Sequence, residues 1–233
     1  YENNIKEYPQ DLRNHTNLGA LYYRNKNYVK ARKILETAVS FTHATPILHK
    51  MLAQTYSAQN ENPKAVQYYE IYLKSVPNDA SAWKEIGTCH FALKEYSKAI
   101  PAFVKARELS SAEDFDVAYL LGCSYLETDN YSKAIAPLGR ARALNNKDFR
   151  VYDALAQCYR NLKETSTLTA ILTDWIAIDP KRYDIKIELG SLMLDAKKIS
   201  EAIAMLTEAS RFIPSEPKPY LLLAQAHEIL GND

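Results

Sequence analysis

The feature that most constrains this chain is a small residue that recurs about every 34 residues inside an apolar stretch. Seven pairs of a Leu or Ile followed by Gly or Ala share one register, in which the successive steps are 34, 34, 35, 34, 34 and 34 residues. A period in this range is typical of proteins in which one helical unit is stacked many times. The chain is therefore expected to fold as a repeat array. The seven small residues are Gly19, Ala53, Gly87, Gly122, Ala156, Gly190 and Ala224.

Each period contains the pattern of two amphipathic helices. A large residue such as Tyr22 or Tyr56 follows the small residue by three positions, on the same helical face as the apolar residue four before it. Further on, an Ala recurs with a large apolar residue four positions later, as in Ala99 and Phe103, and this spacing predicts a second helix. Prolines such as Pro77 then mark where the second helix stops.

The small residues predict that the two helices of a pair approach each other closely. Glycine inside a helix is less favourable than alanine by about 1 kcal/mol, yet four of the six glycines occupy this one position. Close packing that excludes a side chain offsets such a loss. Pro101 and Pro137 fall inside the second-helix stretches of the third and fourth windows, so we expect those helices to begin late or to bend.

The pattern resembles the tetratricopeptide repeat, whose 34-residue signature runs aromatic, Leu-Gly, Tyr, Ala, Phe, Ala and Pro. The third window matches it best, with Trp83, Gly87, Ala99, Phe103 and Ala106. The resemblance implies an all-α fold, an α-solenoid in which antiparallel helix pairs stack into a right-handed superhelix. The register predicts a single array over residues 1–233, with a remnant second helix at 1–11, repeats at 12–45, 46–79, 80–114, 115–148, 149–182 and 183–216, and a final first helix at 217–233.

Charge and hydropathy indicate the class of partner. Twenty-nine Lys and Arg against 28 Asp and Glu leave a formal charge of +1, so no net field attracts nucleic acid or an anionic membrane. This balance disfavours RNA-reading helical repeats, which have a similar length. No apolar run approaches the roughly 20 residues of a membrane-spanning helix. We expect a protein or peptide partner, no nucleic acid and no direct insertion into a membrane.

The cysteines and the two ends of the chain bear on its location and assembly. The three cysteines are widely spaced and read as free thiols, which favours a reducing compartment such as the cytoplasm. The chain starts with Tyr1 rather than Met. We therefore expect it to be part of a longer protein, in which an upstream signal would allow a periplasmic or membrane-tethered location. The apolar stripe of residues 217–233 has no second helix to cover it, which predicts self-association through the terminal repeats.

The residues that catalysis would need are not found in a recognisable arrangement. The sequence has no Gly-rich phosphate loop, HExxH motif, CxxC pair or nucleophile elbow. Histidines such as His15 and His90 occupy aromatic positions of the repeat, where packing is their expected role. Cys89, Cys123 and Cys158 fall on different first helices, too far apart to share a metal ion. We therefore expect no enzyme activity, no cofactor and no metal site.

The resemblance also indicates where a partner binds, because the first helices of such repeats line a concave groove. The side chains facing it are the second, fifth, ninth, twelfth and thirteenth of each window, which share one side of a helix. The carboxylate clamp of chaperone-binding members is not matched, since only Lys50 fits it. The asparagine ladder of another subgroup is replaced by residues such as Met51 and Glu85. The candidate partner-binding residues are Arg13, Tyr23, Arg24, Lys50, Gln54, Lys84, Thr88, Phe91, Asp116, Tyr119, Leu126, Glu127, Asp153, Gln157 and Arg160.

The charge of these groove positions changes along the chain. The first three windows hold four basic and no acidic side chains there, and the next three hold five acidic and two basic ones. We expect a ligand with acidic residues toward the first windows, an apolar anchor near Phe91 and Tyr119, and neutral or basic residues beyond. The alternative is that these are ordinary solvated charges.

The resulting hypothesis is a non-catalytic scaffold or adaptor that binds a partner peptide or helix in its groove. The alternative is a binding module of a larger enzyme, or of a secretion or assembly protein, whose activity lies outside this segment.

Overall fold

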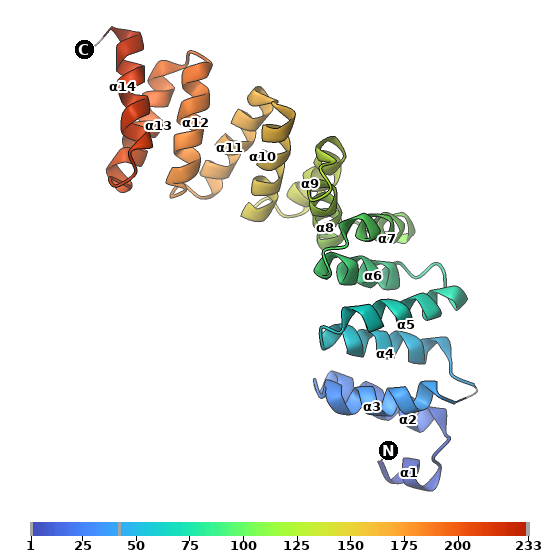
Figure 1. Ribbon diagram of the computed structural model, residues 1–233. Helices are drawn as coiled ribbons and strands as arrows, with labels where there is room; N and C mark the ends of the chain where they lie inside the picture. The colour runs from blue at the N-terminus through green and yellow to red at the C-terminus, as the bar shows by residue number, and fades with distance from the viewer. Residues whose placement is uncertain (1, 42, 232–233) are drawn as a thin grey trace. The chain divides into compact units, whose positions relative to one another are not determined.

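The computed structural model describes residues 2–41 and 43–231 and is all-helical in these ranges. Tyr1, Asn232 and Asp233, at the ends of the first and last expected helices, lie outside the described residues, as does Thr42. Successive helices form antiparallel pairs joined by short turns (Figure 1). The expected all-α class is confirmed. The helices are α1 (Glu2–Glu7), α2 (Leu12–Arg24), α3 (Tyr28–Val39), α4 (Pro46–Ala58), α5 (Asn62–Ser75), α6 (Ala80–Ala92), α7 (Tyr96–Leu109), α8 (Phe115–Leu126), α9 (Tyr131–Leu144), α10 (Phe149–Leu162), α11 (Thr165–Ile178), α12 (Tyr183–Asp195), α13 (Ile199–Phe212) and α14 (Lys218–Leu230).

The chain divides into two compact units, the first ending at Thr128 and the second starting at Asp129. In the first unit the pairs α2–α3, α4–α5 and α6–α7 pack in sequence order, and α8 packs on α7. In the second unit α9 packs on α10, the pairs α10–α11 and α12–α13 follow, and α14 packs on α12 and α13. The division falls inside the predicted repeat 115–148. One continuous array over the whole chain stays a prediction.

We call the first helix of each predicted repeat an A helix and the second a B helix. The A helices are α2, α4, α6, α8, α10, α12 and α14, and the B helices are α3, α5, α7, α9, α11 and α13.

The small residues of the A helices lie where a B helix comes closest. A Cβ atom added to Gly87 would lie 2.7 Å from Cδ1 of Phe103, and one added to Gly19 would lie 2.6 Å from Cδ2 of Leu35. Gly190 is crowded in the same way in the second unit. Carbon atoms in contact are normally about 3.5–4.0 Å apart. The predicted close approach of the paired helices is therefore confirmed at these three glycines.

The prolines inside two B helices do not delay their start. Helix α7 begins at Tyr96 and α9 at Tyr131, in the same repeat register as α5, which begins at Asn62. Both helices continue through their proline, Pro101 in α7 and Pro137 in α9. The predicted late start is wrong, and the alternative, a bend near each proline, stays a prediction. Each proline removes one backbone hydrogen bond, and the buried apolar side chains that surround it in the same helix offset this loss.

Candidate functional site

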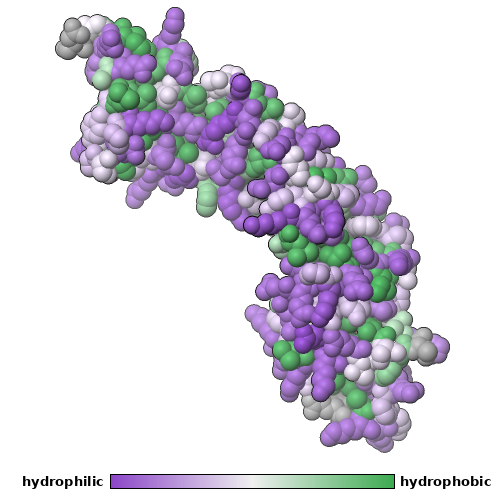
Figure 2. Space-filling view, viewed as in Figure 1, coloured by the Kyte–Doolittle hydropathy of each residue, from purple (hydrophilic) through white to green (hydrophobic). Residues whose placement is uncertain are grey.

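The A helices form the candidate binding surface in each unit. Helices α2 and α4 contact each other, as do α6 and α8 in the first unit and α12 and α14 in the second. We call the exposed side of α2, α4, α6 and α8 the first A face, and that of α10, α12 and α14 the second A face. Hydrophobic residues form scattered patches among hydrophilic ones in the view of Figure 2.

All the predicted groove residues keep some exposure to solvent. Their role in binding stays a prediction. On the first A face lie Arg13, Tyr23 and Arg24 of α2, Lys50 and Gln54 of α4, Lys84, Thr88 and Phe91 of α6, and Asp116, Tyr119, Leu126 and Glu127 of α8 and its C-cap; on the second lie Asp153, Gln157 and Arg160 of α10.

Lys50 is bound by an aspartate at the start of the next A helix. Its Nζ atom lies 2.6 Å from Oδ2 of Asp79, which also accepts a hydrogen bond of 2.6 Å from the Tyr72 hydroxyl. The other oxygen of Asp79 caps α6 by accepting the Ala82 N–H at 3.1 Å. Burial on its own raises the pKa of Asp79, but the hydrogen bonds from Lys50 and Tyr72 outweigh it and hold the pKa below its usual value.

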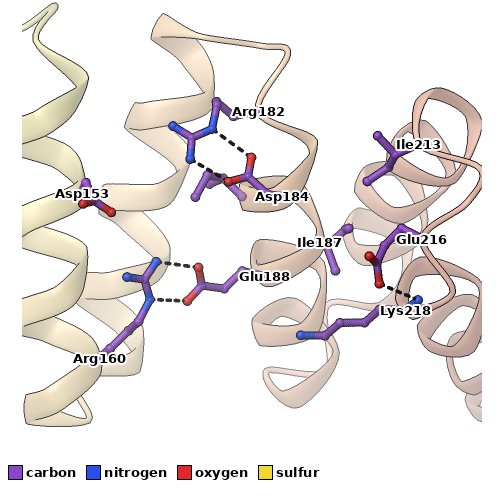
Figure 3. A pocket seen from close by; sticks show the side chains of 10 residues that line it. Asp153, Arg160, Arg182, Asp184, Ile187, Glu188, Ile213, Glu216 and Lys218 are labelled. Atoms are coloured by element: carbon purple, nitrogen blue, oxygen red, sulfur yellow. Dashed lines mark hydrogen bonds and ion pairs between the residues drawn. The ribbon is translucent and has the colours of Figure 1, made fainter.

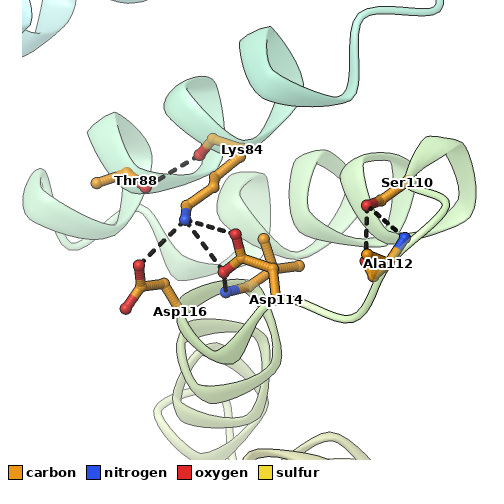
Figure 4. Close-up of polar contacts among 7 residues, drawn as sticks. Lys84, Thr88, Ser110, Ala112, Asp114 and Asp116 are labelled. Carbon is orange, nitrogen blue, oxygen red and sulfur yellow. Dashed lines mark hydrogen bonds and ion pairs between the residues drawn. The ribbon is translucent and has the colours of Figure 1, made fainter. Parts of the chain in front are cut away.

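Lys84 repeats this arrangement one helix pair later (Figure 4). Its Nζ atom lies 2.8 Å from Oδ2 of Asp114 and 3.1 Å from Oδ2 of Asp116. Asp114 caps α8 by accepting the Val117 N–H at 3.1 Å. Burial lowers the pKa of Lys84, and the hydrogen bonds to the two carboxylates more than compensate, so the pKa lies above its usual value. Each lysine thus ties one A helix to the start of the next.

These ion pairs change the expected charge of the first A face. Two of its four predicted bases, Lys50 and Lys84, are neutralised by acidic side chains within the unit. Of the other two, Arg24 is exposed and the Arg13 side chain is 91% exposed, with its Nε atom 3.6 Å from Asp11. An exposed pair at this distance contributes little to recognition or stability. The ion pairs of Lys50 and Lys84 remove half of the positive charge on which the expected preference for an acidic ligand depends.

The acidic caps were missed because only groove positions were counted, although the sequence carries a signal for them. The last position of several predicted windows is acidic, and an Asp directly before a helix is a preferred N-cap. The acidic residues at this position are Asp11, Asp79, Asp114, Asp148 and Glu216. Of these, Asp79 and Asp114 bind the groove lysines Lys50 and Lys84.

The predicted aromatic anchors pack against other rings in the first unit. Tyr23 meets Tyr28 edge-on with ring centres 5.4 Å apart, and Phe91 meets Tyr96 in the same way at 5.2 Å. Tyr119 stacks on a neighbouring phenylalanine of its own helix at 5.9 Å. These contacts hold the half-exposed rings in place, so they remain available as a rigid apolar surface.

The second A face contains a cleft of about 550 Å³ (Figure 3). Two arginines in it are held by paired hydrogen bonds to carboxylates. Arg160 donates to both oxygens of Glu188 at 2.6 and 2.7 Å, and Arg182 donates to both oxygens of Asp184 at 2.9 and 2.6 Å. The cleft is lined by Asp153, Arg160, Arg182, Asp184, Ile185, Ile187, Glu188, Ile213, Glu216 and Lys218.

Two of the predicted groove residues, Asp153 and Arg160, line this cleft. Asp153 accepts a hydrogen bond of 2.8 Å from Gln157 and forms no ion pair with another described residue. The residues from α12 and from the ends of α13 and α14 were mostly not predicted. A volume of this size fits a few side chains of a bound segment.

The part of the chain that the structure describes holds no cluster typical of a metal site and no helix typical of a membrane span. No group of three or more His, Cys, Asp or Glu side chains there is arranged to hold a metal ion. Cys89, Cys123 and Cys158 are buried, and burial raises the pKa of Cys89 to about 11. No helix among the described residues is long and apolar enough to cross a lipid bilayer.

Part of the chain matches a known protein family, and most of it resembles known proteins in sequence or fold. Residues 50–116 match the tetratricopeptide repeat family. The BBSome complex member BBS4 of Bos taurus is 22% identical over 214 residues, which cover 91% of this chain and 40% of the relative. The BBS4 protein of Xenopus tropicalis is 30% identical over 147 residues, 63% of this chain and 28% of its own. The chain thus spans about two fifths or less of the length of these curated relatives.

Solved structures show the same fold. The crystal structure of YrrB, described as a TPR protein with an unusual peptide-binding site, aligns with a TM-score of 0.65 at 22% identity and covers 80% of this chain and 95% of YrrB. The C-terminal part of a TPR repeat-containing protein from Cytophaga hutchinsonii aligns with a TM-score of 0.69 at 18% identity and covers 95% of this chain and 91% of its own. Residues 50–116 therefore belong to the tetratricopeptide repeat family, and the chain has the fold of tetratricopeptide repeat proteins, an α-solenoid of stacked helix pairs.

Proposed function

We propose that this chain is a non-catalytic scaffold segment that binds a peptide or helix of a protein partner on its A faces. The cleft of the second A face carries the proposal, because three A helices contribute charged and aliphatic side chains to one open cavity of about 550 Å³. A mixture of apolar surface and oriented polar groups is what binding sites for protein segments have in common.

The relatives support a role in an assembly. The two BBS4 relatives described above are named as members of the BBSome complex, and the solved neighbour YrrB is described as having a peptide-binding site. Peptide binding by this chain follows from neither, since the first relatives are matched over only part of their length and the second likeness concerns the fold. The alternative, a binding module of a larger enzyme or of a secretion or assembly protein, shares the same A faces and differs only in what the rest of the protein does.

The test compares one substitution on an A face with the same substitution on a B helix. Gln54 lies half-exposed on α4, and Gln67 lies exposed on α5 of the same helix pair. Gln54→Arg places a long charged side chain in the first A face without breaking an ion pair. Reversing Lys50 or Lys84 is a poorer test, because it would also leave Asp79 or Asp114 without its partner.

We expect Gln54→Arg to reduce capture of partner proteins by the tagged chain, and Gln67→Arg to leave it unchanged. Quantitative mass spectrometry of captured proteins measures the effect, and equal melting temperatures for the two variants exclude a folding defect. Equal capture by both variants would mean that partners bind a B-helix surface or the chain ends.

A further inference from the structure

One pair of A-helix positions is filled differently in the two units. The twelfth residue of one repeat and the sixth residue of the next lie 28 or 29 residues apart and form what we call the cross-repeat pair. In the second unit this pair is Arg160 and Glu188, joined by two hydrogen bonds of 2.6 and 2.7 Å. In the first unit the same positions hold Ser57 and Glu85. The carboxylate is present there, but the arginine that would bind it is replaced by a short hydroxyl side chain.

Other cross-repeat pairs need no such partner, because apolar or aromatic side chains occupy both positions. Within the units these pairs are Tyr23 with Met51, Phe91 with Leu120 and Leu194 with Leu222. The pair of Ser57 and Glu85 therefore leaves a carboxylate without the cation that its register position has elsewhere in this chain.

Glu85 is also without a cation in space. It is half-buried and forms no hydrogen bond or ion pair of its side chain with any residue in the described ranges 2–41 and 43–231. Lys50 and Lys84, the nearby bases, are bound to Asp79 and Asp114 instead. Burial raises the pKa of Glu85, and the charges of the two lysines only partly oppose this. A half-buried carboxylate of this kind gains free energy from any cation that reaches it.

A second observation at the same place is an unpartnered tyrosine. Tyr69 is fully buried, and its hydroxyl group has no hydrogen-bond partner among the described residues. Tyr69 lies on α5, which packs on α6, the helix of Glu85; burial raises the pKa of Tyr69, and the charge of Glu85 raises it further. Buried hydroxyl groups are normally hydrogen-bonded, so an unsatisfied one indicates a missing partner.

The ring of Tyr23 completes the surroundings of Glu85. It is half-buried on α2, and its pKa is raised by burial, by Tyr28 and by the charge of Glu85. A carboxylate beside an aromatic ring suits a guanidinium group, which donates several hydrogen bonds in a plane and packs against aromatic faces. An ammonium group matches this combination less well.

We propose that Glu85 binds an arginine side chain of a protein partner, whose guanidinium takes the place that Arg160 takes beside Glu188. The inference rests on the proposed function, in that the arginine arrives on a segment bound to the first A face. It assigns to that face a requirement for a basic residue, the opposite of the acidic ligand that the groove positions predict.

The first test uses a minimal probe on the whole chain. N-acetyl-arginine amide is titrated while the resonances of isotope-labelled Tyr23 and Tyr69 are followed by NMR, with the uncharged isostere N-acetyl-citrulline amide and with N-acetyl-lysine amide as comparisons. We expect saturable shifts with the arginine probe and affinities about tenfold weaker for the other two, as for the loss of one charge-assisted contact. Equal responses to arginine and citrulline, or to arginine and lysine, would overturn the assignment.

Two variants locate the response. Glu85→Gln should abolish the preference for arginine over citrulline, whereas Glu70→Gln, which changes an exposed carboxylate of the B helix α5 in the same unit, should preserve it. An arginine response that survives Glu85→Gln would place the site elsewhere and contradict the proposal.

A further test places an arginine at position 57 of the chain itself, so that it needs no partner. Ser57→Arg should raise the melting temperature and block the arginine probe, and the rise should vanish when Glu85→Gln is added, while Ser57→Met controls for size. No coupling between positions 57 and 85 in this double-mutant cycle would overturn the inference. If Gln54→Arg still reduces partner capture in that case, the proposed function stands without it.

Discussion

At the scale of single residues, contact between Gly87 and Phe103 decides how closely α6 and α7 pack. Phe103 is fully buried, so its ring cannot turn away from an added methyl group without disturbing the core. Gly139 is also inside a helix, but a Cβ atom added there would have nothing within 4 Å. Substitutions at these two glycines therefore distinguish the effect of helix propensity from the effect of packing.

We expect Gly87→Ala to lower the free energy of unfolding by about 1–2 kcal/mol, because overpacking of a rigid ring outweighs the gain in helix propensity. Gly139→Ala should raise it by up to about 1 kcal/mol, because only the propensity changes. Urea unfolding followed by circular dichroism measures both. Stabilisation by Gly87→Ala would show that the helix pair can open to admit a side chain.

At the scale of helices, the lysine–aspartate ties join each A helix to the next. Asp79 both caps α6 and binds Lys50 of α4, so a substitution must separate the two roles. Asparagine is as good an N-cap as aspartate but carries no charge. Asp11 caps α2, and among the described residues its one ion pair is with Arg13 at 3.6 Å, which makes it a matched control.

Asp79→Asn is expected to reduce the free energy of unfolding at pH 7 by about 1–2 kcal/mol, the contribution of a hydrogen bond to a charged group, and Asp11→Asn by less than about 0.5 kcal/mol. The folded-state pKa of Asp79 is depressed, so its stabilisation is present above the unfolded pKa of about 3.9 and is lost as the pH falls through the folded pKa. The difference between the parent and Asp79→Asn should therefore shrink in this acidic range. A difference that is constant down to pH 2 would contradict a charged tie.

The A helices and their small residues could be predicted from sequence, because a 34-residue period and the 3.6-residue helical period together fix which side chains face the paired helix. The partners of the groove lysines could not be predicted in this way. Lys50 on α4 and Asp79, directly before α6, lie 29 residues apart and meet only through the packing of one helix pair on the next. The same holds for Arg160 and Glu188, whose contact depends on how one helix pair packs on the next.

At the scale of the whole molecule, the division after Thr128 was not expected, since the repeat pattern continues through it without a change in composition. The repeat period predicts the contacts inside a helix pair, but it does not predict the strength of the contacts between successive pairs. The final helix was predicted to be partly uncovered. Within its apolar stripe Ala226 is fully buried and Ile229 is exposed, so α13 and α12 cover only part of α14.

Self-association through the terminal repeats stays a prediction, and α14 offers a direct test. Leu221 is 71% exposed, and Tyr220, Ile229 and Leu230 are also exposed on this helix. We expect the chain to form dimers at high concentration in sedimentation equilibrium and Leu221→Lys to weaken them, because it places a charge in the apolar contact. A monomeric parent over the whole concentration range would contradict the prediction.

Because each helix packs chiefly on its neighbours along the chain, these units would respond to mechanical tension in an unusual way for a folded protein. A pull on one end of a unit loads the outermost helix pair first, since no distant segment holds that pair in place. Each pair that yields would release up to about 110 Å of extended chain, the length of 34 residues. The contacts that set the resistance of each step are then the ties between successive A helices, such as that of Lys50 to Asp79.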